Sequence, residues 1–334
     1  MKKEALFWKP LKDETVQCLL CPHHCVLALG KVGICGVRKN EQGTLYSLIY
    51  QACSSMADDP IEKKPLYHFH PGSMVLSLGS VGCTFRCEHC QNYHISMSRP
   101  EDVPLRDIPA NQLSRIAIEH GCQGIAWTYN EPTIWHEYTL EAARLVKKED
   151  LYTVYVTNGY IEEEPLRQLA PYLDAMNIDV KAFHDEFYHT VCKATLTPVI
   201  QTCERAKRLG IHLELTYLVI PGLNDDASEV QRFCHWIAET LGTDTPVHFS
   251  RFHPDYQMKN HQATSTSSLL KCHGIARDEG LQFVYLGNIP HGDYDNTYCP
   301  SCKNLLIERY GFSAHITGMS HGKCSRCNTI IPIR

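Results

Sequence analysis

The 334-residue chain has no long apolar run, no strong excess of one charge and no tract of low complexity. Without an apolar run of about 20 residues, we expect no membrane-spanning helix. Lys and Arg number 32 against 37 Asp and Glu, a net charge of −5, so no basic field exists to attract nucleic acid. A hydrophobic content of 43% is typical of a globular protein and argues against disorder.

An export signal and a dinucleotide-binding glycine motif are also missing. Acidic and polar residues follow Lys2 and Lys3, where a signal peptide would carry an apolar stretch, so we expect a cytoplasmic protein. The first predicted strand ends in Gly79, and no G-x-G-x-x-G follows it. A dinucleotide-binding fold therefore has no support in the sequence.

Cysteine is abundant instead, with 17 cysteines beside 19 histidines. Eleven cysteines form three groups: the N-terminal group (Cys18, Cys21, Cys25, Cys35), the central group (Cys83, Cys87, Cys90) and the C-terminal group (Cys299, Cys302, Cys324, Cys327). A chain of this length in a reducing compartment does not rely on disulfides, so clustered cysteines indicate metal or redox sites. The other six are isolated, and we expect buried apolar side chains there. Among them, Cys192 follows the fourth predicted strand and could face an active site.

Strand-like and helix-like stretches alternate between residues 71 and 290. Seven stretches predict strands: 75–80, 124–129, 152–158, 175–181, 212–220, 247–252 and 283–288. Apolar residues within 138–146 and 230–241 repeat at helical spacing. This alternation predicts an α/β fold with a parallel sheet, and the small number of units favours a partial (β/α)6 barrel over a complete barrel. A doubly wound sheet is the alternative.

Each flanking segment carries one cysteine group. We expect residues 1–70 to form an N-terminal cysteine-rich extension of the barrel at 71–290, and residues 291–334 to form a small C-terminal appendage. The C-terminal group repeats C-x2-C and predicts a zinc-ribbon-like module held by structural zinc, with an electron-relay cluster as the alternative. The N-terminal group leaves two interpretations open. It binds either structural zinc, with His23 and His24 as spare ligands, or an auxiliary iron–sulfur cluster.

The central group lies directly after the first predicted strand, with the spacing C-x3-C-x2-C. Three thiolates on one loop can hold three irons of a [4Fe-4S] cluster and leave the fourth iron open, as catalytic metal sites require. A structural zinc site, with His89 or His94 as fourth ligand, is the alternative.

Polar residues gather at the C-terminal ends of the predicted strands, which is the face where β/α barrels carry their sites. They are Cys83, Glu131, Thr157, Asp179, Asn224 and His253. Asp179 and Lys181 also share one face of their strand. A zwitterionic ligand would meet both charges, with Lys181 at its carboxylate and Asp179 at its ammonium group. A simple ion pair at a solvated strand end is the alternative.

Several motifs recur in an order that resembles the radical S-adenosylmethionine (SAM) superfamily over residues 71–290. After the central group they are WTYNEPT (127–133), VTNG (156–159), DVK (179–181), VIPGLNDD (219–226) and RFHP (251–254). With its CLLCPHHC and CPSC segments, the chain most resembles the radical SAM member of the AmmeMemoRadiSam system, a group related to the pyruvate formate-lyase activating enzymes.

The resemblance implies that the central group holds a [4Fe-4S] cluster whose open iron is chelated by SAM. His89 would lie near the adenine, and Asn130 and Glu131 would meet the amino end of SAM. The rest of SAM would be lined by Asp179, Lys181 and His253. Two departures from the family pattern are Tyr129-Asn130 in place of a Gly-Gly pair and Val156 in place of an Asp.

The same resemblance implies reductive cleavage of SAM to a 5′-deoxyadenosyl radical, which abstracts hydrogen from a small-molecule or peptide substrate. No side chain need act as acid or base in that step, because the cofactors carry the chemistry. The implied partners are an electron donor such as a flavodoxin or ferredoxin and the other proteins of the AmmeMemoRadiSam system. Two alternatives are an activating enzyme that generates a glycyl radical on a partner protein, and a non-catalytic multi-zinc binding module.

Overall fold

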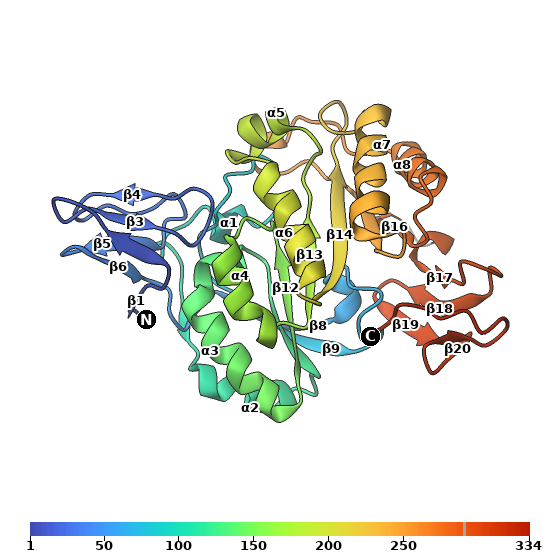
Figure 1. Ribbon diagram of the computed structural model, residues 1–334, viewed down its shortest axis with the longest axis horizontal. Helices are drawn as coiled ribbons and strands as arrows, with labels where there is room; N and C mark the ends of the chain where they lie inside the picture. The colour runs from blue at the N-terminus through green and yellow to red at the C-terminus, as the bar shows by residue number, and fades with distance from the viewer. Residues whose placement is uncertain (290–291) are drawn as a thin grey trace.

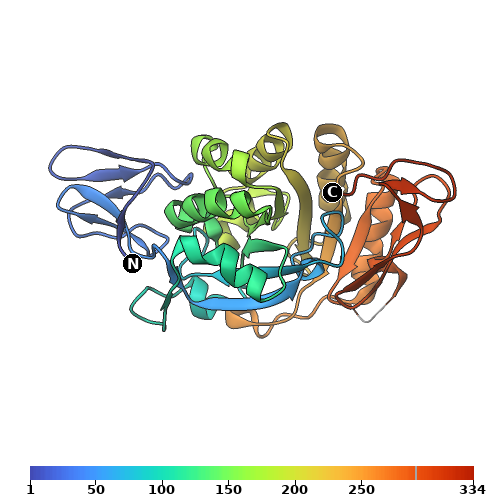
Figure 2. The same cartoon turned by 90° about the horizontal axis from the view of Figure 1, so that it is seen from below.

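The computed structural model describes residues 1–289 and 292–334. A large central α/β unit lies between two small β-rich modules, which sit on opposite sides of it in both views (Figures 1 and 2). The first module is N-terminal and the second is C-terminal. In the described part of the chain, no helix combines the length and apolar character that crossing a bilayer requires.

The central unit is built on one eight-stranded sheet with the order β16-β15-β14-β13-β12-β11-β9-β8. Its strands are β8 (Ser55–Pro60), β9 (Met74–Gly79), β11 (Gly124–Trp127), β12 (Tyr152–Thr157), β13 (Ala175–Asp179), β14 (His212–Val219), β15 (Val247–Arg251) and β16 (Val284–Gly287). The seven strands from β9 onward are mutually parallel, and β8 pairs antiparallel with β9. Their near-continuous burial explains why the sequence shows apolar runs at these positions.

The strand order decides between the two architectures that the sequence allows. Each parallel strand lies beside the next one along the chain, so the order never reverses. A doubly wound sheet reverses at a switch point, and that alternative is therefore wrong. The seven predicted strands are all present, one more than the six of the predicted partial barrel. In the residues that the structure describes, β8 and β16 form the two edges of the sheet.

Helices follow the strands and cover them. They are α1 (Tyr93–Ser96), α2 (Leu113–Glu119), α3 (His136–Val146), α4 (Glu163–Leu169), α5 (Asp185–Phe187), α6 (Thr197–Arg208), α7 (Ala227–Trp236) and α8 (Thr266–Asp278). Helix α7 begins after Asp226, whose carboxylate accepts hydrogen bonds from the backbone N–H groups of Ser228 and Glu229. Contacts of α3 with β12, α6 with β14 and α8 with β16 bury the apolar helix faces against the sheet.

The N-terminal module consists of two small antiparallel sheets and the loops between them. One sheet has the order β1-β6-β5 and the other β2-β3-β4. The strands are β1 (Lys3–Glu4), β2 (Trp8–Pro10), β3 (Val16–Cys18), β4 (Val26–Leu27), β5 (Arg38–Glu41) and β6 (Thr44–Ser47). Two further short strands, β7 (Ala52–Cys53) and β10 (Arg106–Asp107), pair with each other. Strand β8 follows before residue 70 yet belongs to the central sheet.

The C-terminal module is a three-stranded sheet with a short hairpin beside it. The sheet contains β17 (Thr297–Tyr298), β18 (Leu305–Tyr310) and β19 (Ser313–Ile316). The hairpin contains β20 (Met319–Ser320) and β21 (Lys323–Cys324). The buried apolar side chains of the module, among them Leu306 and Ile307, form one cluster with Tyr67, Phe283 and Tyr285 of the central unit. The module therefore shares its apolar core with the central unit.

A buried polar network holds the segment before β9 against the sheet. The carboxylate of Glu214 on β14 is fully buried and accepts hydrogen bonds from the backbone N–H groups of Tyr67 and His68. It also contacts the imidazoles of His212, at 3.0 Å, and His248, at 2.7 Å. These partners lower the pKa of Glu214 well below its usual value, although burial alone would raise it. The network therefore packs a charged group inside the sheet without leaving it unpaired.

Candidate active site

A cavity of about 550 Å³ opens at the C-terminal ends of the parallel strands. Each of the seven parallel strands of the central sheet contributes to it, either at its end or through the loop that follows. The predicted site residues among its lining are Cys83, Cys87, His89, Cys90, Asn130, Glu131, Thr157, Asp179 and Lys181. Because the C-terminal ends of parallel strands meet at one edge, residues almost 100 positions apart share this cavity. Its volume is typical of a site for a small molecule or cofactor.

The loop after β9 brings all three thiols of the central group to the cavity. Burial raises the pKa of the Cys83 and Cys90 thiols, and a hydrogen bond to Cys192 together with burial raises that of Cys87. Without a cation, these thiols stay protonated at neutral pH, so their donor set suits a strongly bound metal. Because thiolates on different irons of a cluster stand further apart than ligands of one ion, the open spacing of this loop fits a [4Fe-4S] cluster.

Glu131 and Asn158 form a buried clamp behind the central group. One Glu131 oxygen accepts hydrogen bonds from the Thr133 backbone N–H at 2.9 Å and the Thr157 hydroxyl at 2.7 Å. The other accepts from the backbone N–H of Asn158 at 2.8 Å. The Asn158 amide in turn donates to Thr84 and lies 3.7 Å from the Cys83 sulfur. Three donors hold the Glu131 carboxylate, so its first role in this structure is to position the loops around Cys83.

Asn130 connects the loop after β11 to the loop that carries the central group. Its amide oxygen accepts from the backbone N–H of Ser80, and its amide nitrogen donates to the carbonyl of Gly82, both at 3.0 Å. The preceding residue, Tyr129, has a positive φ of 72° and donates its hydroxyl to Asp59. The Tyr129-Asn130 pair, which departs from the family's Gly-Gly, therefore supplies side-chain anchors to both neighbouring segments.

Asp179 and Lys181 lie together at the end of β13. The ammonium group of Lys181 donates to the Asp179 carboxylate at 2.9 Å. Burial alone would lower the pKa of Lys181, but the charges of Asp179 and Cys87 raise it well above its ordinary value. Lys181 is therefore a fixed positive charge on the cavity wall, and Asp179 supplies the negative charge beside it. The pair presents both charges that a zwitterion needs.

His89 lies on the cavity wall with an unused polar atom. Within the described chain, its buried Nδ1 has no hydrogen-bond partner. Burial, and secondarily the charge of Lys181, lower the pKa of this imidazole to about 3, so it is neutral at physiological pH. A buried nitrogen without a partner costs free energy unless a ligand satisfies it. Its position therefore fits a cofactor with polar ring atoms.

Two residues that the sequence places at strand ends do not line this cavity. His253 is exposed, and its Nδ1 lies 3.1 Å from the carbonyl oxygen of Pro254. Asn224 is buried in the turn after β14, where its amide donates to the carbonyls of Lys181 and Leu218. Asn224 thereby fixes the backbone of Lys181, whereas the structure assigns His253 no contact with the other site residues.

Sequence reasoning gave no role to Lys64, Asp59 or Asn158, whereas it placed Cys192 where it could face an active site. Lys64 lines the cavity and donates to the buried carboxylate of Asp59 at 2.7 Å. Cys192 bonds the Cys87 thiol from a turn of π-helix, Tyr188–Cys192, but it is not among the residues that line the cavity. Asn158 stands inside the VTNG motif, which could have drawn attention to it. The Asp59–Lys64 pair has no comparable motif.

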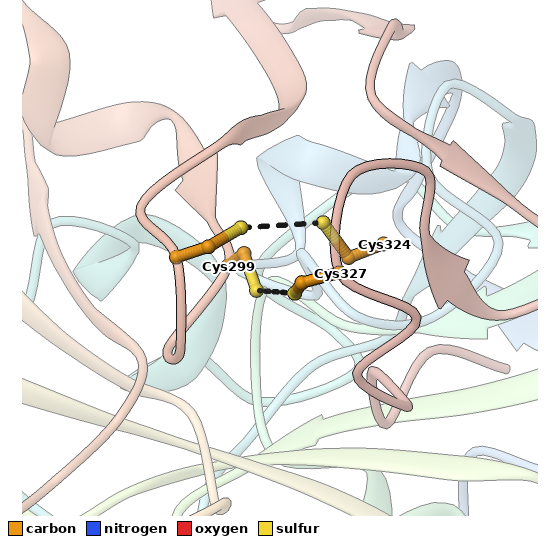
Figure 3. A group of neighbouring side chains, drawn as sticks. Cys299, Cys324 and Cys327 are labelled. Atoms are coloured by element: carbon orange, nitrogen blue, oxygen red, sulfur yellow. Dashed lines mark hydrogen bonds between the residues drawn. The ribbon is translucent and has the colours of Figure 1, made fainter.

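The C-terminal group forms a second, separate site. Its four sulfur atoms all lie within 4.8 Å of one another. The closest pairs are Cys299–Cys327 at 3.5 Å and Cys302–Cys324 at 3.6 Å, which Figure 3 shows as two dashed lines. Hydrogen bonds to Thr329 lower the pKa of Cys327 to about 6. Four sulfurs this close can share one metal ion in tetrahedral geometry.

Comparison with known proteins identifies the family. Residues 78–234 match the model of the radical SAM superfamily. The match begins on β9 and includes the central group, both clamp residues and the Asp179–Lys181 pair. The chain belongs to the radical SAM superfamily, whose members are enzymes, and this membership implies SAM and an iron–sulfur cluster as cofactors. Enzymes of this superfamily generally need a reductant.

The chain is similar to several curated relatives, three of which are described here. An uncharacterised protein of Methanocaldococcus jannaschii is 44% identical over 333 residues, with 99% of each chain covered. GTP 3′,8-cyclase of Brucella canis is 22% identical, covering 74% of this chain and 70% of its own. Pyruvate formate-lyase 1-activating enzyme of Escherichia coli is 21% identical, covering 45% of this chain and 63% of its own. The predicted relationship to activating enzymes is thus confirmed at the level of the superfamily.

A solved structure supports the same fold. SuiB of Streptococcus suis, bound to SAM, superposes with a TM-score of 0.51 and 12% sequence identity. The match covers 68% of this chain and 53% of that chain. At this identity the similarity concerns the fold alone.

Proposed function

We propose that this enzyme binds SAM in the cavity at the ends of β9–β16 and cleaves it reductively at a [4Fe-4S] cluster held by Cys83, Cys87 and Cys90. Bound together, the reduced cluster and SAM supply a 5′-deoxyadenosyl radical that abstracts hydrogen from a substrate. The observation that carries this proposal is that one cavity is lined by three thiols, a pair of opposite charges and a ring nitrogen without a partner.

Different residues of the cavity bind different parts of SAM. Lys181 meets the carboxylate and Asp179 the ammonium group of its methionine part, while His89 faces the adenine. Asn130 and Glu131 position the adjoining loops and lie at the amino end. His253 keeps its predicted role only if the loop after β15 turns toward the cavity when SAM binds, since it is exposed here.

We propose that the substrate is a small molecule or a peptide. The enzyme would act on it together with the other proteins of the AmmeMemoRadiSam system. The extra cysteines precede the barrel, and residues 91–110 after the central group contain no cysteine. Activating enzymes with additional clusters usually insert them there, which favours this substrate class over a glycyl radical partner. The activating function remains the second candidate because of the similarity to the Escherichia coli enzyme. A non-catalytic zinc-binding module is disfavoured because the chain belongs to a superfamily of enzymes.

We further assign structural zinc to the C-terminal group, a flavodoxin or ferredoxin as electron donor, and a cytoplasmic location. The mutual distances of the four C-terminal sulfurs support zinc, because a single tetrahedral ion requires them. We infer the location from the many free cysteines, because the cytoplasm keeps thiols reduced. Such a compartment would also contain the reduced electron donor.

The test of the SAM site is a binding measurement on anaerobically reconstituted protein. Lys181→Met should weaken SAM binding about 10- to 100-fold, because it removes one charged hydrogen bond of about 1.5–3 kcal/mol. Equilibrium dialysis with labelled SAM provides the measurement, and Lys148→Met, an exposed lysine on the barrel surface, is the matched control. Equal affinity of the Lys181→Met variant and the wild type would contradict the assignment.

The two substrate classes differ in their radical products. With candidate partner proteins, reductant and SAM, a stable glycyl radical in the electron paramagnetic resonance (EPR) spectrum would establish the activating function. Substrate-dependent formation of 5′-deoxyadenosine without such a radical, together with a modified small molecule or peptide in the mass spectrum, is the result that our proposal predicts.

A further inference from the structure

The N-terminal group places four thiols within one small module. Cys18 and Cys35 are buried, and Cys21 and Cys25 are partly buried. The backbone N–H of Cys18 donates to the carbonyl of Cys25 at 3.0 Å. Burial, with smaller contributions from the neighbouring Cys18 and Cys25, raises the pKa of Cys35 to about 11. Burial also raises the pKa of the Cys21 and Cys25 thiols, and thiols that are this hard to ionise need a cation to become thiolates.

The spacing of these thiols differs from that of a single-ion site. Among the described residues, the C-terminal group is the one Cys, His, Asp or Glu cluster whose ligand atoms all approach within 4.8 Å. The N-terminal group does not meet this limit, and neither does the central group, which the superfamily assigns to an iron–sulfur cluster. Like the thiols of the central group, and unlike the four C-terminal sulfurs, the N-terminal thiols are therefore spaced more widely than the ligands of a single ion.

The neighbouring histidines are committed to other contacts. A ring nitrogen of His23 lies 2.7 Å from the carbonyl oxygen of Thr84, next to Cys83. His24 pairs with Glu162 at 3.0 Å. Both residues attach the module to the barrel, so the ligand set that remains is four sulfurs.

The N-terminal group lies between solvent and the loop of the central group. On the inner side, the carbonyl oxygen of Cys35 packs on Gly82 so closely that a side chain at Gly82 would overlap it. Arg86 donates to the carbonyl of Ile34 on the same side. The side chains of Val26 and Ile34, which neighbour Cys25 and Cys35 in the sequence, are 60% and 46% exposed. The loops that carry these cysteines therefore reach both solvent and the backbone beside Cys83.

A buried ion pair fixes this arrangement. The Arg38 guanidinium on β5 donates to the Glu137 carboxylate on α3 at 2.7 Å, and both side chains are almost fully buried. Glu137 also accepts from the backbone N–H of Leu6. Since a buried pair tolerates little displacement, the module is held in one position on the barrel.

We propose that Cys18, Cys21, Cys25 and Cys35 bind a second iron–sulfur cluster that passes one electron to the cluster on the central group. This inference rests on the proposed function of the central group. A one-electron protein donor of the flavodoxin or ferredoxin class is oxidised, the N-terminal cluster is reduced and then reoxidised, and the central cluster is reduced. No bond or proton moves in this transfer. Because four thiolates occupy every protein-binding position, the cluster offers no open iron to a substrate.

Metal content after removal of the central group tests the proposal. In a Cys83→Ala, Cys87→Ala, Cys90→Ala variant, reconstituted with iron and sulfide without oxygen, we expect about two to four irons per chain with matching sulfide. Adding Cys18→Ser and Cys21→Ser should remove this iron. As a matched control, Cys302→Ser should lower zinc and leave iron unchanged. A triple variant without iron that holds a second zinc would overturn the proposal.

Unmodified protein gives a second readout that does not depend on how the variants fold. After reduction, the EPR spectrum should contain two cluster signals, and SAM should change only the one from the cluster with the open iron. A single signal that SAM changes completely would contradict a second cluster.

The relay itself is tested by the rate of reduction. With reduced flavodoxin, the SAM-sensitive signal should form at least 10-fold more slowly in Cys18→Ser, Cys21→Ser than in the Cys302→Ser control. Equal rates would refute the relay. Wild-type protein that cleaves SAM but holds zinc in the N-terminal group would overturn this inference alone. Protein with both clusters that never cleaves SAM would overturn the proposed function instead.

Discussion

Around Cys83, polar side chains hold the loop of the central group by hydrogen bonds to distant parts of the chain. Asn130 bonds both Ser80 and Gly82, and Asn158 bonds Thr84 and approaches the Cys83 sulfur. These contacts act before any cofactor binds, since they fix the backbone from which the thiols project. Asn158 has an additional consequence, because N–H groups near cluster sulfurs tune the reduction potential.

Asn158→Ala should lower the reduction potential of the central cluster. The amide donor next to Cys83 stabilises the reduced, more negative state, and a hydrogen bond worth about 1 kcal/mol corresponds to roughly 40 mV for one electron. A redox titration followed by EPR measures the change. Asn288→Ala is the control, because Asn288 lines the same cavity but bonds Ser250. Identical potentials in the two variants would refute this role.

At this scale, the sequence predicted residue types better than residue partners. Cys83, Asn130, Glu131 and Lys181 could be placed at strand ends because each motif follows a predicted strand directly. The bonds of Glu131 to Thr157 and of Asn158 to Cys83 span 26 and 75 positions, and no local pattern encodes such pairs. His253 shows the limit, because the end of a strand does not determine where the following loop turns.

At the scale of elements, β8 anchors the site to the edge of the sheet. Its Asp59 is buried and pairs with Lys63 at 2.8 Å and Lys64 at 2.7 Å. The same carboxylate accepts the Tyr129 hydroxyl at 2.6 Å. Burial opposes ionisation, but these three donors keep the pKa of Asp59 well below its usual value. One side chain thereby connects β8 with the cavity wall and the loop after β11.

Asp59→Asn should destabilise the protein by about 3 kcal/mol, because it leaves the buried Lys64 ammonium without its counter-ion. Urea unfolding monitored by circular dichroism gives the free energy of unfolding. In the control Glu119→Gln, which removes an exposed i,i+4 pair with Arg115, the change should stay under about 1 kcal/mol. A loss no larger than in the control would show that the pair does not anchor the loop.

Most strands and helices of the central unit could be predicted from the sequence, but strand β8 could not. The seven parallel strands and α7 were predictable, because apolar runs and helical periodicity are local signals and Asp226 marks the helix start. Strand β8 was not, since SMADDP is polar in part and contains a proline. Its place in the sheet depends on pairing with β9, which is a tertiary choice.

At the scale of the whole molecule, the two cysteine modules differ in their relation to the active site. The N-terminal module packs on the loop of the central group, whereas the C-terminal module lies on the opposite side of the central α/β unit (Figure 1). The spacing of the cysteines predicted both modules. It does not indicate against which part of the central unit each module packs. The segment around His68 connects the C-terminal module to the barrel, since the backbone N–H of Arg334 donates to the carbonyl of His68.

Acidification should weaken this connection. His68 is fully buried, and burial lowers the pKa of its imidazole to about 3, against the opposing charge of Glu214. The unfolded chain binds a proton below about pH 6.5 and the folded protein does not, so stability is complete above that pH and falls as the pH is lowered. At pH 5 the loss from His68 is about 2 kcal/mol.

Thermal unfolding at pH 7.5 and pH 5 tests this expectation. In His68→Asn the difference between the two pH values should be smaller than in the wild type, because the titrating group is gone. An equal difference in both proteins would assign the acid sensitivity to other groups.

The central claim, that the thiols of Cys83, Cys87 and Cys90 support cleavage of SAM, is tested most directly by the product. Protein reconstituted without oxygen is mixed with dithionite and SAM, and 5′-deoxyadenosine is measured by mass spectrometry beside a Cys87→Ala control. Our account predicts the product in the wild type and none in the control. Wild-type protein with iron and sulfide bound but without 5′-deoxyadenosine, or equal product in both proteins, would contradict it.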